Sequence, residues 1–279
     1  MSSLRATTLR AASREALEAA QGRLDEVLAE QATEPAALGA ELYAVVELLS
    51  TEIPLRRAVA DASSDAASRT RLVRQLLSDK VAESTLQVLD EVVVNRWSSP
   101  RELLDGIELL AGSALLARAE RDGTLDTVED ELFRAGRLIA GNVELERALS
   151  DHAAPAAAKR ELIRRLFADK VNTVTVTLLE NVITLMRGRG VVFNLDELAE
   201  RAAVRRQRSV AHVISARALS EEQQRQLAER LQGIYARPIA LHVEIDPAIG
   251  GGLIVKVGDE VIDGSAAGQL DALRRQLAG

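Results

Sequence analysis

The sequence predicts a mainly α protein with two tandem helical bundles followed by a small α/β domain. The composition is 47% apolar but only 2% aromatic, which suits closely packed helices. The first two thirds of the chain contain an internal repeat, and from about residue 209 apolar residues alternate with polar ones, as they do in strands. The expected domains are therefore 1–110, 111–208 and 209–279.

The repeat is found by aligning residues 55–93 with residues 145–183 without a gap. Asp79-Lys80-Val81 then lies over Asp169-Lys170-Val171, and most other positions keep their chemical character. Because the same positions are apolar in both segments, each copy is expected to have the same fold. A period this long is typical of a duplicated helical bundle rather than of a solenoid unit.

Each copy contains an amphipathic helix whose apolar residues recur at helical spacing. These residues are Leu72, Val73, Leu76 and Leu77 in the first copy, and Leu162, Ile163, Leu166 and Phe167 in the second. Arg74 and Arg164 occupy corresponding positions on the polar side. The apolar stripe is expected to face a helical core.

Residues 102–121 carry an apolar stripe where the first copy should end and the second begin. We expect one helix shared between the copies here. Further upstream, Gln21-Gly22 can be aligned with Asp122-Gly123 if about eleven extra residues are allowed in the first copy. The extra segment would include the break at Pro35.

The last third predicts a compact α/β module. A strand begins near Val210, and Ser220 with Gln223 forms a capping box before the next helix. The buried face of that helix is predicted to consist of Leu227, Leu231 and Ile234.

A second strand covers residues 239–245, where apolar and polar residues alternate. Residues 253–257 and 260–263, separated by Gly258-Asp259, predict a hairpin. A final helix is expected to bury one side, formed by Ala266, Leu270, Leu273 and Leu277.

Several classes of function are disfavoured by composition. The chain has no cysteine, which excludes disulfides and thiolate chemistry, and a net charge of −7, which disfavours nucleic-acid binding. The apolar stretch over residues 109–117 is too short to span a bilayer, which takes about 20 residues. We therefore expect neither nucleic-acid binding nor direct membrane insertion.

The residues that could suggest a chemical site are explained more simply as parts of turns or of the packed structure. No Lys-Ser or Lys-Thr follows Gly250-Gly251-Gly252, so these glycines predict a turn into a strand rather than a phosphate site. No catalytic, cofactor-binding or metal-ligating residue is assigned, and no cofactor is expected.

Two groups of polar residues receive the same interpretation. The histidines, His152, His212 and His242, have no second histidine or carboxylate at ligand spacing, which favours structural or solvated roles. Among the arginines of residues 201–208, Arg201 and its neighbours can pair with Glu197 and Glu200, which favours a solvated helix end.

One segment carries a family resemblance. Residues 243–277 resemble the C-terminal signature of the ATP synthase delta subunit family, called oligomycin-sensitivity-conferring protein in mitochondria. The matching positions include Asp246, Pro247, Gly251, Gly252, Gly258, Asp259, Asp263, Gly264, Ser265 and Leu270. Residues 125–132 and 218–223 also resemble the family, and the extra first copy is similar to that of the elongated actinobacterial members.

The resemblance implies a non-catalytic stator subunit of F-type ATP synthase, present as one copy in a hetero-oligomeric complex. Its helical part would bind N-terminal helices of the alpha subunits, and its C-terminal domain would bind the C-terminal region of the b subunit. It would lie at the cytoplasmic face of the cell membrane, peripheral through the complex. The alternatives are a helical adaptor for unrelated partner helices and an enzyme that binds a nucleotide in its glycine-rich domain.

Overall fold

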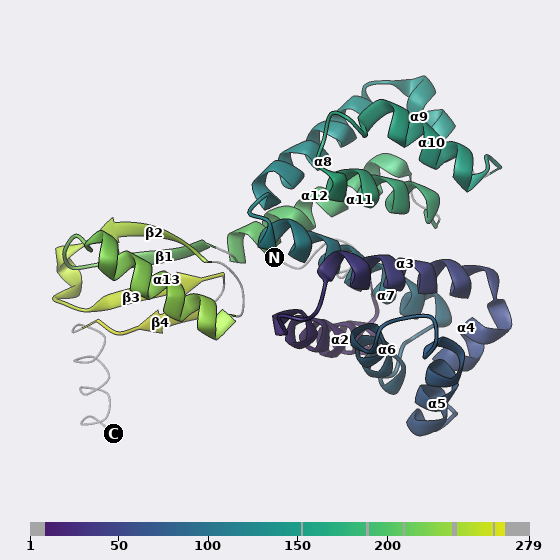
Figure 1. The fold of residues 1–279 in the computed structure, drawn as a ribbon, viewed down its shortest axis with the longest axis horizontal. Coiled ribbons are helices and arrows are strands. Elements are labelled where there is room, and N and C mark those ends of the chain that lie inside the picture. Colours follow the sequence, from purple (N-terminus) through teal and green to yellow (C-terminus); the bar gives the residue numbers. More distant parts are fainter. Residues whose placement is uncertain are drawn as a thin grey trace. The chain divides into compact units, whose positions relative to one another are not determined.

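The computed structural model describes residues 9–151, 153–187, 190–208, 210–235, 239–258 and 260–265. The chain divides into two compact units, Met1–Ala202 and Ala203–Gly279. The first unit is helical and the second contains a four-stranded sheet (Figure 1). The predicted fold class, mainly α with a small α/β domain, is confirmed.

Local sequence signals determine where the helices begin. The side chains of Asp65, Ser99 and Asn142 accept hydrogen bonds from backbone N–H groups at the starts of their helices. The helices are α2 Ala11–Ala29, α3 Pro35–Thr51, α4 Ile53–Ala60, α5 Ala66–Leu77, α6 Glu83–Val94, α7 Pro100–Arg121, α8 Leu125–Ala140, α9 Val143–Ser150, α10 Ala156–Phe167, α11 Thr173–Thr184 and α12 Val191–Arg208.

The helices repeat with an offset of 90 residues. The first and last residues of α9, α10 and α11 lie 90 residues after those of α4, α5 and α6. Helices α3 and α8 also begin 90 residues apart, at Pro35 and Leu125. The expectation of about eleven extra residues in the first copy is therefore wrong. Gly22 lies inside α2, whereas Gly123 follows the end of α7 with φ 67°, a common position for glycine after a helix.

Helix α7 belongs to both copies. At the same offset α2, α7 and α12 correspond, so α7 is the last helix of the first copy (α2 to α7) and the first helix of the second copy (α7 to α12). It packs against α2, α3 and α4 of the first copy and against α8 and α11 of the second. This is the shared helix expected over residues 102–121, and the expected domain boundary at residue 110 falls inside it.

Polar contacts repeat along with the helices. The carboxylate of Glu41 accepts hydrogen bonds from the backbone N–H of Ala82 (2.9 Å) and the hydroxyl of Thr85. In the second copy, the carboxylate of Glu131 accepts the corresponding hydrogen bonds from the backbone N–H of Asn172 (2.9 Å) and the hydroxyl of Thr175. Each carboxylate satisfies free donors at the start of a helix, α6 or α11.

The polar side of the amphipathic helices forms ion pairs, as its charge suggests. Arg74 on α5 lies 2.6 Å from Asp90 and 2.8 Å from Glu83, and Arg164 on α10 lies 2.7 Å from Glu180. On the apolar side Val73, Leu77, Ile163 and Phe167 are buried. Leu76 departs from the expectation because a large part of its side chain is exposed.

The second unit is a mixed sheet with strand order β2-β1-β3-β4. Strands β1 and β2 are parallel and joined through helix α13, whereas β3 pairs antiparallel with both β1 and β4. The elements are β1 Val210–Ser215, α13 Glu221–Tyr235, β2 Ala240–Ile245, the short 3-10 helix η1 Pro247–Ile249, β3 Leu253–Val257 and β4 Glu260–Asp263.

The start of α13 has the predicted capping box. The backbone N–H of Gln223 donates to Oγ of Ser220, and the backbone N–H of Ser220 donates to Oε1 of Gln223. The predicted buried face of α13 is wrong at Ile234, which is 66% exposed. The packed positions are Leu227, Leu231 and Tyr235, because residues four apart share one helix face. The expected final helix lies outside the described residues.

Candidate docking surfaces

The family-signature residues build turns in the sheet unit. The side chain of Asp246 accepts a hydrogen bond from the N–H of Ala248 (2.8 Å), and Pro247 is the first residue of η1. Gly250 then ends η1 with φ 72°. These residues turn the chain from β2 into β3.

Position 252 requires glycine because another backbone segment lies close to it. Its φ is 78°, and a Cβ at this position would lie 2.2 Å from the carbonyl oxygen of Gly264. The N–H of Gly264 donates to the carbonyl of Leu253 (2.9 Å), so the two segments are held together. Gly251 (φ 146°) and Gly258 (φ 59°) also have positive φ values, which favour glycine.

Asp263 and Ser265 form a turn after β4. The carboxylate of Asp263 accepts hydrogen bonds from the hydroxyl (2.6 Å) and the N–H (2.9 Å) of Ser265. These two hydrogen bonds lower the pKa of Asp263 from its ordinary value. Two other signature positions, Asp259 and Leu270, lie outside the described residues, as does His152.

The structure corrects the interpretation of the basic residues of α12 as a solvated helix end. Arg201 is not part of a solvated helix end, because its guanidinium is partly buried and donates to the carbonyl of Leu109 and to Oγ of Ser113 (3.0 Å). Both acceptors belong to α7. Arg201 therefore joins α12 to the shared helix, a contact between segments that are 88 residues or more apart in the sequence.

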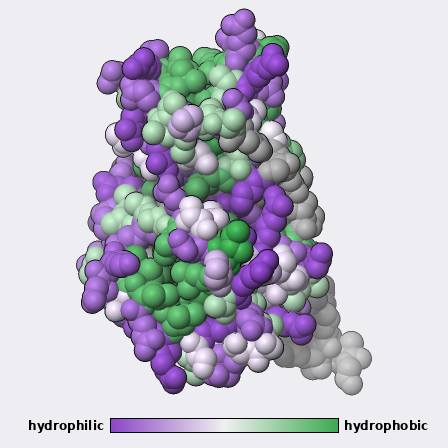
Figure 2. All heavy atoms as spheres, turned by 90° about the vertical axis from the view of Figure 1, so that its right-hand side faces the viewer, coloured by the Kyte–Doolittle hydropathy of each residue, from purple (hydrophilic) through white to green (hydrophobic). Residues whose placement is uncertain are grey.

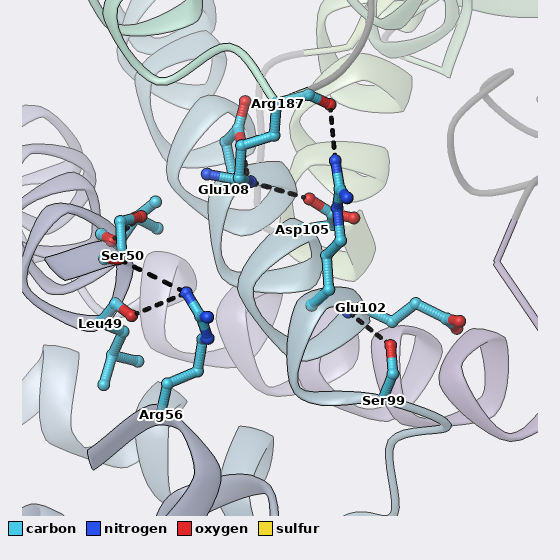
Figure 3. A network of polar contacts seen from close by, with 10 residues as sticks. Leu49, Ser50, Arg56, Ser99, Glu102, Asp105, Glu108 and Arg187 are labelled. Atoms are coloured by element: carbon cyan, nitrogen blue, oxygen red, sulfur yellow. Dashed lines mark hydrogen bonds and ion pairs between the residues drawn. The ribbon is translucent and has the colours of Figure 1, made fainter. Parts of the chain in front are cut away.

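A second arginine joins the end of α11 to α7. Arg187 pairs with Asp105 (2.9 Å) and with Glu108, and the three side chains are largely buried (Figure 3). The carbonyl of Arg187 accepts a hydrogen bond from Arg101 (3.0 Å), also on α7. Removing one partner from a buried ion pair leaves the other charge uncompensated, so these contacts hold the segment after α11 to α7.

An apolar hollow in the helical unit is too small for a ligand. Its volume is about 20 Å³, whereas small-molecule sites usually measure about 300–1,000 Å³. It is lined by apolar side chains of the first copy: Val45, Leu48, Leu49, Leu55, Val59, Val73, Leu76, Leu77, Leu89, Val93, Leu103 and Ile107. It is better explained as imperfect core packing.

Apolar side chains are nevertheless exposed on both units. Figure 2, which faces α4 and α5 below and α9 and α10 above, shows apolar side chains gathered over both parts of the helical unit. The large exposed apolar residues of the described chain are Ile53, Leu76, Val94, Phe133, Leu138, Val143, Phe193, Ile234, Ile245, Val261 and Ile262. Single exposed apolar side chains are common, and only where they gather into a contiguous patch do they mark a surface for a protein partner.

The histidines of the sheet unit also differ from expectation. His212 on β1 and His242 on β2 are register partners, with their Nδ1 atoms 3.4 Å apart. The spacing of the two residues in the sequence did not predict this contact. Even so, no three or more metal-ligating side chains gather within the described part of the chain.

None of the described helices combines the length and the apolar character that crossing a membrane requires.

Two helical copies that share a buried helix, followed by a small mixed sheet with glycine turns, define the class of protein: a mainly α protein with a small α/β unit. The model of the ATP synthase delta (OSCP) subunit family matches residues 112–277. That match begins inside α7 and covers the second copy and the sheet unit.

Relatives cover the first copy as well. The chain is 47% identical to ATP synthase subunit delta of Nocardia farcinica, over 96% of this chain and 99% of the relative. It is 42% identical to that of Streptomyces griseus (97% and 100%) and 44% identical to that of Corynebacterium diphtheriae (97% and 100%). The chain therefore belongs to the ATP synthase delta (OSCP) subunit family, whose members are non-catalytic components of the peripheral stalk.

Proposed function

We propose that this chain connects the catalytic head of ATP synthase to the membrane-anchored stalk and resists rotor torque. Its helical unit binds N-terminal helices of the alpha subunits, and its sheet unit binds the C-terminal region of the b subunit. One copy acts in each complex, at the cytoplasmic face of the cell membrane. The observation that supports this proposal is that one chain carries two separate compact units, each with exposed apolar side chains.

The proposed role requires strong binding to the partner subunits rather than catalysis. A stator contact must hold while the rotor turns, which favours large apolar interfaces over weak encounters. Helices bind helices by placing an apolar stripe into a groove. In the helical unit, Arg187 and Arg201 fasten the end of the second copy to the helix that both copies share, so force applied to one copy is transmitted to the other.

The experiment uses the full-length chain with purified head and purified b subunit. A variant with exposed apolar residues of the sheet replaced, Ile245→Asp with Val261→Asp, should lose binding to b and keep binding to the head. The wild-type chain should bind both at once. The proposal fails if head and b associate equally well without this chain, or if the sheet variant loses the head instead of b.

A further inference from the structure

His212 and His242 lie side by side on the outer face of the sheet. They are register partners on the parallel strands β1 and β2, so their side chains stand on the same face. Helix α13 covers the opposite face, because Leu231 packs there with Ala211 and Val213 of β1. Both histidines are exposed. Two imidazole rings are therefore accessible to a ligand from solution.

The geometry of the two rings fits a shared metal ion. Their Nδ1 atoms are 3.4 Å apart, which is longer than a good N–H hydrogen bond, whose heavy atoms lie about 2.7–3.2 Å apart. The rings are nearly perpendicular, at 87°, so they do not stack face to face. An ion held by two imidazole nitrogens at about 2.0–2.1 Å, with tetrahedral angles, separates those nitrogens by about 3.3–3.4 Å. The observed distance matches that separation.

The spacing favours a tetrahedral ion over a square-planar one. Neighbouring ligands of a square-planar ion such as Cu²⁺ lie at right angles, which would bring the two nitrogens to about 2.8–3.0 Å. Zn²⁺ prefers tetrahedral coordination and binds imidazole. No third metal-ligating side chain gathers with the pair among the described residues, so water completes the coordination. Such a site is weaker than a structural zinc site with four protein ligands.

The charges around the pair leave room for a cation. Lys256 of β3 is the register partner of His212 and shares its face. Because the strand order is β2-β1-β3, Lys256 lies on the side of His212 away from His242. Glu244 lies two residues after His242 on β2, on the same face, and its carboxylate attracts a cation. Positive charge is therefore on the far side of His212 from the ion, and negative charge is on the near side.

We infer that His212 and His242 bind a divalent transition-metal ion that prefers tetrahedral coordination, such as Zn²⁺, through their Nδ1 atoms. In the described sheet β2 is an edge strand paired with β1 (Figure 1). An ion held by one residue of each strand ties the edge strand to its neighbour. Since a ligand that binds only the native state stabilises it, the metal slows the opening of β2. The inference does not depend on the proposed function, because it concerns the sheet unit alone.

The test titrates Zn²⁺ into the full-length chain after removal of metal with a chelator. The wild-type chain should bind one ion at this site, and the imidazole nitrogen NMR signals of both His212 and His242 should shift. When free Zn²⁺ is about ten times its Kd, amide hydrogen exchange in β2 should slow by about tenfold. His212→Gln and His242→Gln should each abolish the slower exchange and the shift of the remaining histidine. Unchanged melting temperatures without metal check that both variants fold.

Lys256→Gln is the matched control, because Lys256 is exposed on the same face and is not a ligand. This variant should bind Zn²⁺ at least as tightly as the wild-type chain, since it removes a nearby positive charge. The inference is overturned if the wild-type chain binds no Zn²⁺ with a Kd below about 1 mM, or if both histidine variants bind it equally well. Unmoved imidazole signals in the wild-type chain would overturn it without any variant.

Discussion

The indole ring of Trp97 lies directly against the backbone of Gly106. A Cβ at Gly106 would lie 2.1 Å from Cη2 of Trp97. The ring cannot move away easily, because Trp97 is buried and its Nε1–H donates to the carbonyl of Val92 (2.7 Å). This contact fastens the segment between α6 and α7 to the shared helix.

Gly106→Ala should therefore destabilise the chain by about 1–3 kcal/mol, the usual cost of overpacking a core. Denaturant unfolding of both proteins measures the difference. Gly22→Ala in α2 is the control, because nothing lies within 4 Å of its added Cβ. It should stabilise the helix by about 0.5–1 kcal/mol. Equal effects of the two substitutions would contradict the proposed tight contact.

The repeated carboxylates make a second prediction. Glu41→Gln and Glu131→Gln should each lower the free energy of unfolding by about 1–3 kcal/mol, because charged acceptors at the starts of α6 and α11 are replaced by neutral ones. The two losses should be similar, since the copies share the same geometry. Chemical unfolding of the single and double variants tests this, and a neutral effect in one copy would show that the two contacts are not equivalent.

The sheet unit depends on Gly252. Gly252→Ala should cost about 2 kcal/mol or more, because φ is 78° and the added Cβ would meet the backbone of Gly264. Amide hydrogen exchange should show faster opening in β1 and β3 and no change in α2 to α11. Gly233→Ala in α13 is the control, since its added Cβ meets nothing within 4 Å. Loss of protection throughout the helical unit would be the contrary result.

Asp263 provides a prediction about pH. Hydrogen bonds from Ser265 lower the pKa of Asp263 in the folded state. The carboxylate therefore stabilises the fold fully above the pKa that it has in the unfolded chain, about 3.9. That stabilisation is lost as pH falls through the lower pKa of the folded chain. Ser265→Ala should raise the pKa of Asp263 towards its ordinary value. A carboxyl carbon NMR titration between about pH 2 and pH 6 measures it. An unchanged pKa would show that the hydroxyl is not a hydrogen-bond donor to this carboxylate.

The correspondence between α3 and α8 was not predicted from the sequence. Phe133 and Arg137 lie on α8 and carry no motif of their own. The gapless 90-residue alignment could have drawn attention to them, because it places Arg137 where the first copy has Glu47. Misaligning Gln21-Gly22 with Asp122-Gly123 hid that relationship. Only the helix bounds showed that α3 and α8 correspond.

The sequence by itself determined the two amphipathic helices of the repeat, the shared helix, the capping box at Ser220, the hairpin around Gly258 and the family, because each depends on residues close together in the chain. Helix periodicity and positive φ are local properties. Only the tertiary structure decided that His212 meets His242, that Arg201 binds α7 and that Ile234 is exposed. Those contacts depend on strand register and on the packing of distant helices, which are set by many small interactions summed over the whole unit.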